Sequence, residues 1–203
     1  HIHGGLADSG PDRGKAALAR GIPVVFAPGN SDFIIAGPIE VAEAQFPGKK
    51  YHIHNPALTA VRTNLDDLKP LADQVAAMCA DASGPVSFFV PLKGFSNHDS
   101  PYGHIHDPSI PGPFAEYAQS VMPANVEFKA IDAHFNDDAF ADAVIAKARA
   151  SASSAAKGTC RSARISASAS TPSSSTWGLT SRSQGGCGSV GAGAAGKPRR
   201  RGR

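Results

Sequence analysis

The stretch Val86-Ser87-Phe88-Phe89-Val90, followed by Pro91-Leu92-Lys93-Gly94-Phe95-Ser96-Asn97-His98-Asp99, decides the fold class of this 203-residue chain. The first part is short, uncharged and mostly apolar, which is typical of a strand buried on both faces of a parallel sheet. The second part is a polar loop. The same succession occurs at residues 22–27 with the loop 28–32, and at residues 126–131 with the loop 132–137.

Helical segments separate these strands. Between the first two, apolar residues recur at spacings of three and four, which is typical of a helix: Leu65, Leu68, Leu71, Val75 and Met78. Residues 111–121 and the segment beginning at Asp137 or Asp138 predict two further helices. We therefore predict an α/β fold with a Rossmann-like, open, mainly parallel sheet and helices on both faces.

Three shorter elements are also predicted. Residues 9–12 indicate a helix start, with the helix ending at Gly21. Residues 51–54 alternate in polarity and predict a short strand. Asn55-Pro56 predicts the N-cap and first residue of a short helix.

Charge divides the chain into two unlike parts. All 17 acidic residues lie between Asp8 and Asp142, whereas residues 151–203 contain nine basic residues and no acidic one. The second part consists largely of Ser, Gly, Ala and Arg, so it cannot bury enough apolar surface to offset chain entropy. We predict an α/β domain over residues 1–150 and a disordered tail over residues 151–203. Translation in a shifted frame would also produce such a tail.

Composition limits the partners and the compartment. No apolar stretch reaches the roughly 20 residues needed to cross a bilayer, and no secretory signal is present. We predict a cytoplasmic protein without a membrane partner. The basic end at residues 197–203 is typical of nucleic-acid binding, but we expect no nucleic-acid partner because this end lies outside the domain. The first residues read as mid-domain sequence, so we expect the natural protein to begin earlier.

The three strand-end loops predict a binding site, because ligands of open α/β sheets lie beyond the carboxyl ends of the strands. Turns containing Gly29, Asn30, Gly94 and Ser96 can present N–H groups to phosphate or carboxylate oxygens. Lys93 adds positive charge, and Arg62 can clamp an anion with two hydrogen bonds. Asp32 or Asp99 can hold Mg²⁺. The alternative, weighted equally, is that the two glycines only permit tight turns.

Asp132 and His134 are candidates for acid–base chemistry, because a persisting strand would place both on one side. The alternative is that these side chains cap helices and solvate loop ends.

Three His-x-His pairs occur, at His1/His3, His52/His54 and His104/His106. Two imidazoles on one strand face can bind a metal, with Asp99, Asp107 or Asp132 completing the set. Hydrogen-bonded structural histidines are more common, so we predict no metal site.

Four motifs in order carry a family resemblance: residues 28–33, residues 54–63, residues 91–108 with Asp99, and residues 132–141. They resemble Pro-Gly-x-x-Asp, His-Asn-Pro-x-x-Thr-x-x-Arg-Thr, Pro-Leu-x-Gly-x-Ser…Asp…Asp-Pro and Asp-x-His-x-Asn-Asp-x-x-Phe-Ala. The family shares the N-terminal domain of the tomato mosaic virus resistance protein. This sequence departs from it at Asn30-Ser31 and at Lys93.

The resemblance covers roughly residues 4–149 and implies two Rossmann-like subdomains, of which this chain is similar to the second. The first subdomain is then a missing partner. Because members are often described as ATP-binding, the resemblance implies ATP, with Mg²⁺, at these residues: Gly29, Asn30, Asp32, His54, Asn55, Arg62, Thr63, Lys93, Gly94, Ser96 and Asp99.

We predict a domain that binds a nucleotide or another small anionic ligand. Two alternatives stay open. One is an enzyme acting on a small carboxylate or a phosphorylated metabolite through Asp132 and His134. The other is a protein-interaction module. The sequence also leaves the oligomeric state open, a homo-oligomer included.

Overall fold

The computed structural model of the chain describes residues 1–168, with side-chain surroundings for residues 1–154. The predicted disorder of residues 169–203 lies outside the described residues. The elements are, in order, α1 (Lys15–Ala19), β1 (Val24–Phe26), β2 (Phe33–Ala36), α2 (Ile39–Gln45), β3 (Tyr51–Asn55), β4 (Leu58–Arg62), α3 (Leu65–Cys79), β5 (Val86–Pro91), the 3-10 turn η1 (Asn97–Asp99), α4 (Pro111–Val121), β6 (Val126–Ile131) and α5 (Asp138–Ser168).

The three predicted strands form one parallel sheet in the order β1-β5-β6. Val24 pairs with Val86, and Val86 pairs with Val126. Every residue of the central strand β5 is buried. This explains its continuous apolar run, because a central strand covered on both faces has no side that contacts water.

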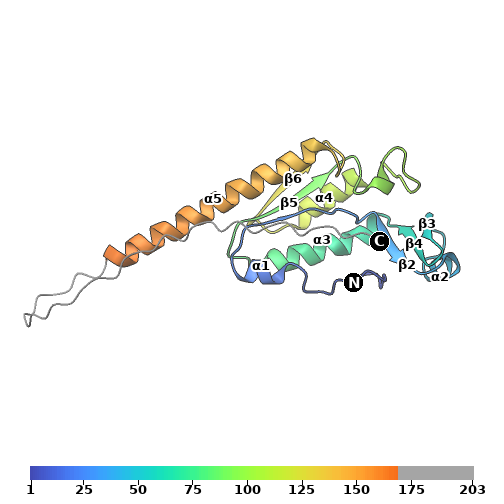
Figure 1. Cartoon of the computed structure of the whole chain (residues 1–203), viewed down its shortest axis with the longest axis horizontal. Helices are drawn as coiled ribbons and strands as arrows, with labels where there is room; N and C mark the ends of the chain where they lie inside the picture. The colour runs from blue at the N-terminus through green and yellow to red at the C-terminus, as the bar shows by residue number, and fades with distance from the viewer. Residues whose placement is uncertain (169–203) are drawn as a thin grey trace, which may run out of the picture.

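Helices cover both faces of this sheet, which confirms the predicted α/β class (Figure 1). Phe88 and Val90 pack in the same core as residues of α3 and α4, among them Leu68 and Phe114. Phe89 points to the opposite face and packs with Phe140 of α5. Alternate residues of one strand therefore anchor different helices, as the period of two requires.

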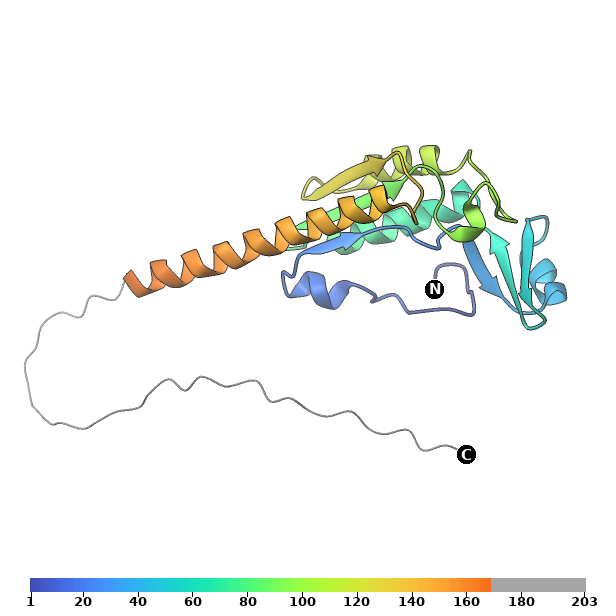
Figure 2. The same cartoon turned by 45° about the horizontal axis from the view of Figure 1, so that its top comes forward.

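A second, antiparallel sheet has the order β2-β4-β3 and lies beside one end of the parallel sheet (Figures 1 and 2). Its core is small and includes Ile34, Val61 and Ala42 of α2. The sequence analysis predicted the strand at residues 51–54 but neither α2 nor β4, and so not this second sheet.

The short helix predicted from Asn55-Pro56 is wrong. These residues turn the chain from β3 into β4, and the Asn55 Oδ1 accepts a hydrogen bond from the Ala57 N–H at 2.9 Å. An asparagine makes this local bond both in turns and at helix N-caps. The following residues decide between the two, because Thr59, Ala60 and Val61 pair with strands on both sides.

Two helix ends differ from the prediction. The helix α1 begins at Lys15, after a Gly14 with φ of 91°, so residues 9–12 lie in the preceding segment. The helix α5 runs past the predicted boundary at residue 150 and is described as far as Ser168. Figure 2 shows it extending beyond the sheets. Within residues 1–168, no helix is long and apolar enough to span a membrane.

The N-terminus of α3 carries a capping box, and disrupting this box is expected to lower the stability of the fold. The Asn64 side chain accepts from the Asp67 N–H at 2.9 Å, while the Asp67 carboxylate accepts from the Asn64 N–H at 2.7 Å. Asn64→Ala is expected to lower the free energy of unfolding by about 1 kcal/mol. Urea unfolding checks this against Glu116→Ala, an exposed position of α4 where about 0.5 kcal/mol or less is expected. Equal losses in the two variants would contradict the capping role.

Candidate functional site

The three strand-end loops contact one another, as the sequence analysis predicted. The Asn30 N–H donates to the Phe95 carbonyl at 3.0 Å, and the Phe135 N–H donates to the Gly94 carbonyl at 3.1 Å. The middle loop, residues 91–99, therefore lies between the other two. Backbone hydrogen bonds thus join the three loops, and side-chain bonds from Ser96 and His134 add to them.

Gly94 is required at the centre of the middle loop. Its φ is 122°, a conformation that residues with a Cβ rarely adopt. A Cβ at this position would overlap the Asp99 carbonyl oxygen and lie 2.9 Å from Cδ2 of His134. Gly29 allows a second close approach, because a Cβ there would overlap the Phe135 ring. The glycines thus let the loops touch.

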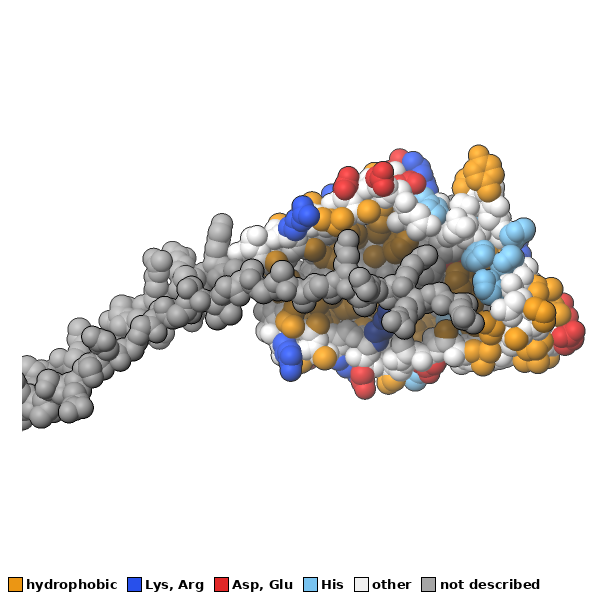
Figure 3. All heavy atoms as spheres, viewed as in Figure 1, with side chains coloured by type: hydrophobic (Ala, Val, Ile, Leu, Met, Phe, Trp, Pro, Cys, Tyr) orange, Lys and Arg blue, Asp and Glu red, His pale blue; other side chains and the backbone are white. Residues whose placement is uncertain are grey.

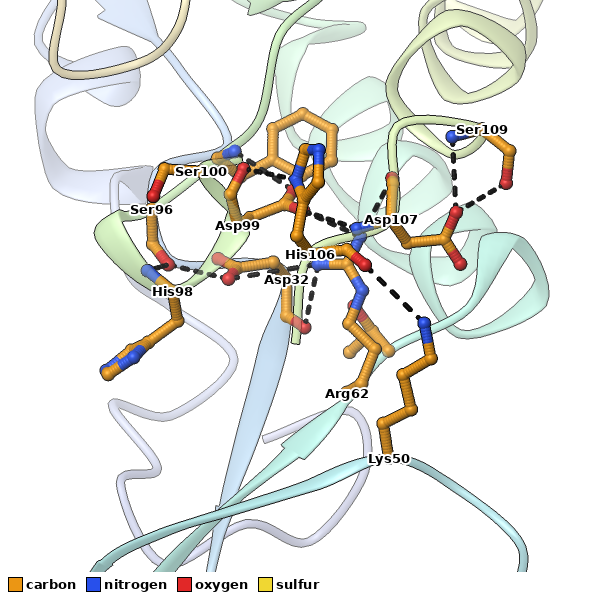
Figure 4. A network of polar contacts seen from close by, with 12 residues as sticks. Asp32, Lys50, Arg62, Ser96, His98, Asp99, Ser100, His106, Asp107 and Ser109 are labelled. Atoms are coloured by element: carbon orange, nitrogen blue, oxygen red, sulfur yellow. Dashed lines mark hydrogen bonds and ion pairs between the residues drawn. The ribbon is translucent and has the colours of Figure 1, made fainter. Parts of the chain in front are cut away.

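On the inner side of the middle loop, Arg62 lies between two buried carboxylates (Figure 4). Its Nη2 is 3.2 Å from Oδ1 of Asp99, and its Nη1 is 3.8 Å from Oδ2 of Asp32. The arginine side chain is 5% exposed and both carboxylates are 0% exposed. Arg62 also donates to the carbonyls of Asp32 and Asp107. The guanidinium predicted to clamp an anion is therefore occupied by the protein itself.

Asp32 is only partly hydrogen-bonded in this network, as is Arg62, whose Nε has no partner among the described residues. The Ser96 hydroxyl donates to its Oδ2 at 2.6 Å, whereas its Oδ1 has no hydrogen-bond partner among the described residues. Burial raises the pKa of Asp32 above its ordinary value, with the Asp99 charge adding to the rise, while the Ser96 hydrogen bond and Arg62 oppose it. Asp32 and Asp99 thus face the interior, and neither is placed to meet a Mg²⁺ ion from solvent.

On the outer side of the middle loop lies a cavity of about 570 Å³, which we call the rim cavity. It occupies the carboxyl ends of β5 and β6. Its polar and aromatic lining includes Lys93, Asn97, Tyr102, His106, His134 and Asn136. Lys93 pairs with the exposed Asp132 at 3.1 Å, and its own side chain is 55% exposed. The rim cavity therefore holds the accessible positive charge predicted from the sequence.

His134 and Asp132, the candidates for acid–base chemistry, each have other partners within the described part of the chain. The His134 Nε2 donates to the Ser96 carbonyl at 2.9 Å, and its Nδ1 accepts from the Asn136 N–H at 3.1 Å. A carbonyl only accepts and an N–H only donates, so these partners fix the neutral tautomer with the proton on Nε2. Asp132 is bonded to Lys93 instead.

A second cavity of about 550 Å³ lies beside the end of β1. Gly29, Asn30 and Thr63 line it, together with apolar residues of β1 and α3. Asn30 has a φ of 58°, and the Thr63 hydroxyl donates to the Ser31 carbonyl at 2.8 Å. Three predicted binding residues thus line a different cavity from Lys93 and His134.

The remaining predicted residues lie elsewhere. His54 and Asn55 are exposed at the end of β3, and the Ser96 side chain is buried within the middle loop. The sequence analysis missed Tyr102, Asn97 and Asn136 as lining residues. The position of Asn97 and Asn136 in strand-end loops was an available signal, whereas nothing local marks the exposed Tyr102.

The histidines of the His-x-His pairs fall into two groups: those that bond to a protein atom and those that lie close to other histidines. His1 pairs with Asp8, His3 bonds to the Asp67 carbonyl, and His106 bonds to the Asp99 carbonyl. His52 and His54 instead lie near His98. Burial lowers the pKa of His52, and the nearby charges of His98, His104 and His54 lower it further.

Comparison with known proteins places the chain in a family. Residues 1–152 match the C-terminal domain of the uncharacterised protein family UPF0261. The chain belongs to the UPF0261 family. A UPF0261 protein of Brucella suis is 30% identical over 143 residues, which is 70% of this chain and 34% of that protein. One of Clostridium tetani is 30% identical over 150 residues, covering 72% and 36% of the two chains.

The resemblance to the tomato family is confirmed. The ToMV resistance protein Tm-1 of Solanum lycopersicum is 29% identical over 147 residues, 71% of this chain and 20% of that protein. The ToMV susceptible protein tm-1 of the same plant is 28% identical over the same length. This UPF0261 domain spans about a third of the bacterial relatives and a fifth of the tomato proteins.

Proposed function

We propose that this UPF0261 domain binds a small phosphate-bearing ligand, with ATP as the reference case, in the rim cavity. The observation that carries the proposal is the position of Lys93 in a cavity of about 570 Å³ at the carboxyl ends of the parallel strands. Ligands of open α/β sheets bind at this edge, and cavities of about 300–1,000 Å³ suit small molecules.

The side chains of the rim cavity fit the parts of a nucleotide. Both side chains of the Lys93–Asp132 pair are exposed, so the pair contributes little to stability. A phosphate can therefore replace the carboxylate as the partner of Lys93. Asn97 and Asn136 supply amide donors and acceptors for a sugar or phosphate. Tyr102 offers an exposed ring against which a base can stack. The proposal assigns no metal ligand to Asp32 or Asp99, because both are buried.

Calorimetry with the whole chain tests this proposal. ATP, ATP with Mg²⁺, tripolyphosphate and adenosine are titrated separately, so that recognition of the phosphates and of the base are distinguished. Lys93→Ala is expected to weaken ATP binding by about tenfold or more, since a hydrogen bond to a charged group contributes about 1.5–3 kcal/mol.

The matched control is Lys15→Ala, because Lys15 is 53% exposed and forms a similar surface pair with Asp12 at 2.7 Å. The affinity of the Lys15→Ala variant for ATP is expected to equal that of the unmodified chain. Absence of binding by a folded chain would overturn the proposal, as would equal affinity of the Lys93→Ala variant.

We do not extend the proposal to catalysis by Asp132 and His134, because both ring nitrogens of His134 are already hydrogen-bonded. Nor do we extend it to the resistance named for the tomato relative. Resistance and susceptible proteins match this chain almost equally, so the shared residues do not separate the two behaviours.

A further inference from the structure

Four histidine side chains lie together beside the small antiparallel sheet, outside the lining of both cavities. They are His52 and His54 on β3, His98 in η1 and His104 in the segment before α4. The ring centroid of His52 is 4.5 Å from that of His98 and 4.7 Å from that of His104. Figure 3 shows histidine side chains gathered on this face.

These four rings lack the hydrogen bonds that explain the other histidines. His1, His3, His106 and His134 each bond a ring nitrogen to a protein atom. Within the side chains that the structure describes, no ring nitrogen of the four clustered histidines has such a partner. A structural role through hydrogen bonding therefore does not account for them.

Three of the four histidines bring ring nitrogens close to one another. One ring nitrogen from each of His52, His54 and His98 lies within 4.8 Å of the other two. Zinc bound tetrahedrally at about 2.0–2.1 Å holds its ligand nitrogens about 3.4 Å apart. Rotation of exposed and half-buried side chains can close this difference. We propose that His52, His54 and His98 bind one divalent transition-metal ion of the Zn²⁺ type, with a further coordination position open to water.

The backbone explains how the three rings come together. His52 and His54 are two residues apart on an edge strand, and the register of β3 shifts between Ile53 and Asn55. Such a bulge re-aims side chains. The His98 N–H donates to the Ser96 hydroxyl at 3.1 Å, and its ring meets Phe33 edge to face at 5.6 Å. Figure 4 shows the His98 ring pointing away from Asp32 and Arg62.

His104 has a different part in this cluster. Its ring is stacked on that of His52 with only 14° between the planes. Two stacked rings cannot both direct an in-plane lone pair at one ion. His104 is therefore a positioning residue that holds the His52 ring in place.

The donor set selects the class of metal. All three donors are imidazole nitrogens, which suit Zn²⁺, Co²⁺, Ni²⁺ and Cu²⁺, whereas Mg²⁺ and Ca²⁺ require oxygen ligands. The second ring nitrogens have no protein acceptor among residues 1–154. Loss of such outer partners typically weakens metal sites by about 10–100-fold, so we expect affinity for Zn²⁺ in the micromolar range.

Metal titration of the tag-free chain, stripped with EDTA and dialysed, tests the proposal. Calorimetry is expected to show one Zn²⁺ per chain, Co²⁺ is expected to produce visible d–d absorption, and Mg²⁺ to produce neither. The double variant His52→Ala/His54→Ala and the single variant His98→Ala are each expected to lose Zn²⁺ affinity by about tenfold or more. His104→Ala is expected to lose less and to alter the Co²⁺ spectrum.

The matched control is His1→Ala/His3→Ala, because both histidines of this His-x-His pair already have protein partners. It is expected to bind Zn²⁺ as the unmodified chain does. His54→Ala alone serves as a second variant, because the His54 side chain is exposed and its removal is expected to leave the fold intact. Circular dichroism confirms the fold of each variant. The absence of stoichiometric binding, or equal affinity in the two double variants, would overturn the proposal.

Discussion

Replacing Arg62 by methionine is expected to lower the free energy of unfolding by about 3–5 kcal/mol, the usual cost of removing one partner from a buried ion pair. Methionine fills much of the same volume as arginine, so the loss of stability reflects the missing charge more than a cavity. The change leaves Asp32 and Asp99 buried without their counter-charge. Asp32 precedes β2, Arg62 ends β4 and Asp99 follows β5, so the loss falls on the junction of the two sheets.

Urea unfolding followed by circular dichroism measures this effect, with Lys15→Met as the control. Lys15 also pairs with a carboxylate, but in solvent, where about 0–1 kcal/mol is expected. A loss in Arg62→Met no larger than that of the control would show that the buried pairs do not stabilise the fold.

The deficit of Arg62→Met is also expected to depend on pH. Burial already raises the pKa of Asp32, and Arg62 opposes that rise, so its removal raises the pKa further. An acid whose pKa is higher in the folded state contributes stability at low pH and loses it as the pH rises through the folded-state pKa. The deficit is therefore smaller at about pH 5 than at about pH 7.5. Unfolding at the two pH values checks this, and a deficit that shrinks as pH rises would contradict it.

Replacing Gly94 by alanine is expected to cost about 3 kcal/mol or more, because strain and overlap add together. The φ of 122° disfavours any Cβ, and this Cβ would also meet the Asp99 carbonyl and the His134 ring. Thermal or urea unfolding measures the loss. Because Gly94 joins the three strand-end loops, we also expect weaker ATP binding in the rim cavity.

Gly48→Ala separates strain from overlap. Gly48 has a φ of 74°, and a Cβ there would meet nothing within 4 Å. This control is expected to lose about 1 kcal/mol, the cost of left-handed backbone for a residue with a Cβ. If Gly94→Ala lost no more than Gly48→Ala, the close approach of the loops at Gly94 would not be a structural requirement.

The elements of the parallel sheet could be predicted because their patterns are local. The apolar run 86–90 and the helical spacing of Leu65, Leu68 and Val75 report burial directly, and β5 and α3 lie where those patterns predict. The hairpin at Asn55-Pro56 could not be predicted, since asparagine makes the same local bond in a turn and at a helix start.

The amino-acid sequence by itself determined the α/β class and the family to which the chain belongs, because each depends on local patterns. The convergence of the three strand-end loops followed only from the parallel strand arrangement that this class implies. Only the tertiary structure decided which polar side chains became internal. From the sequence alone, Arg62 is predicted to bind an anion at the surface. In the structure it is enclosed by Asp32 and Asp99, which come from two other segments. The histidine cluster likewise joins two segments that are remote in sequence, residues 52–54 and 98–104. Charge pairing and ligand geometry depend on distances between such segments, and no local pattern encodes those distances.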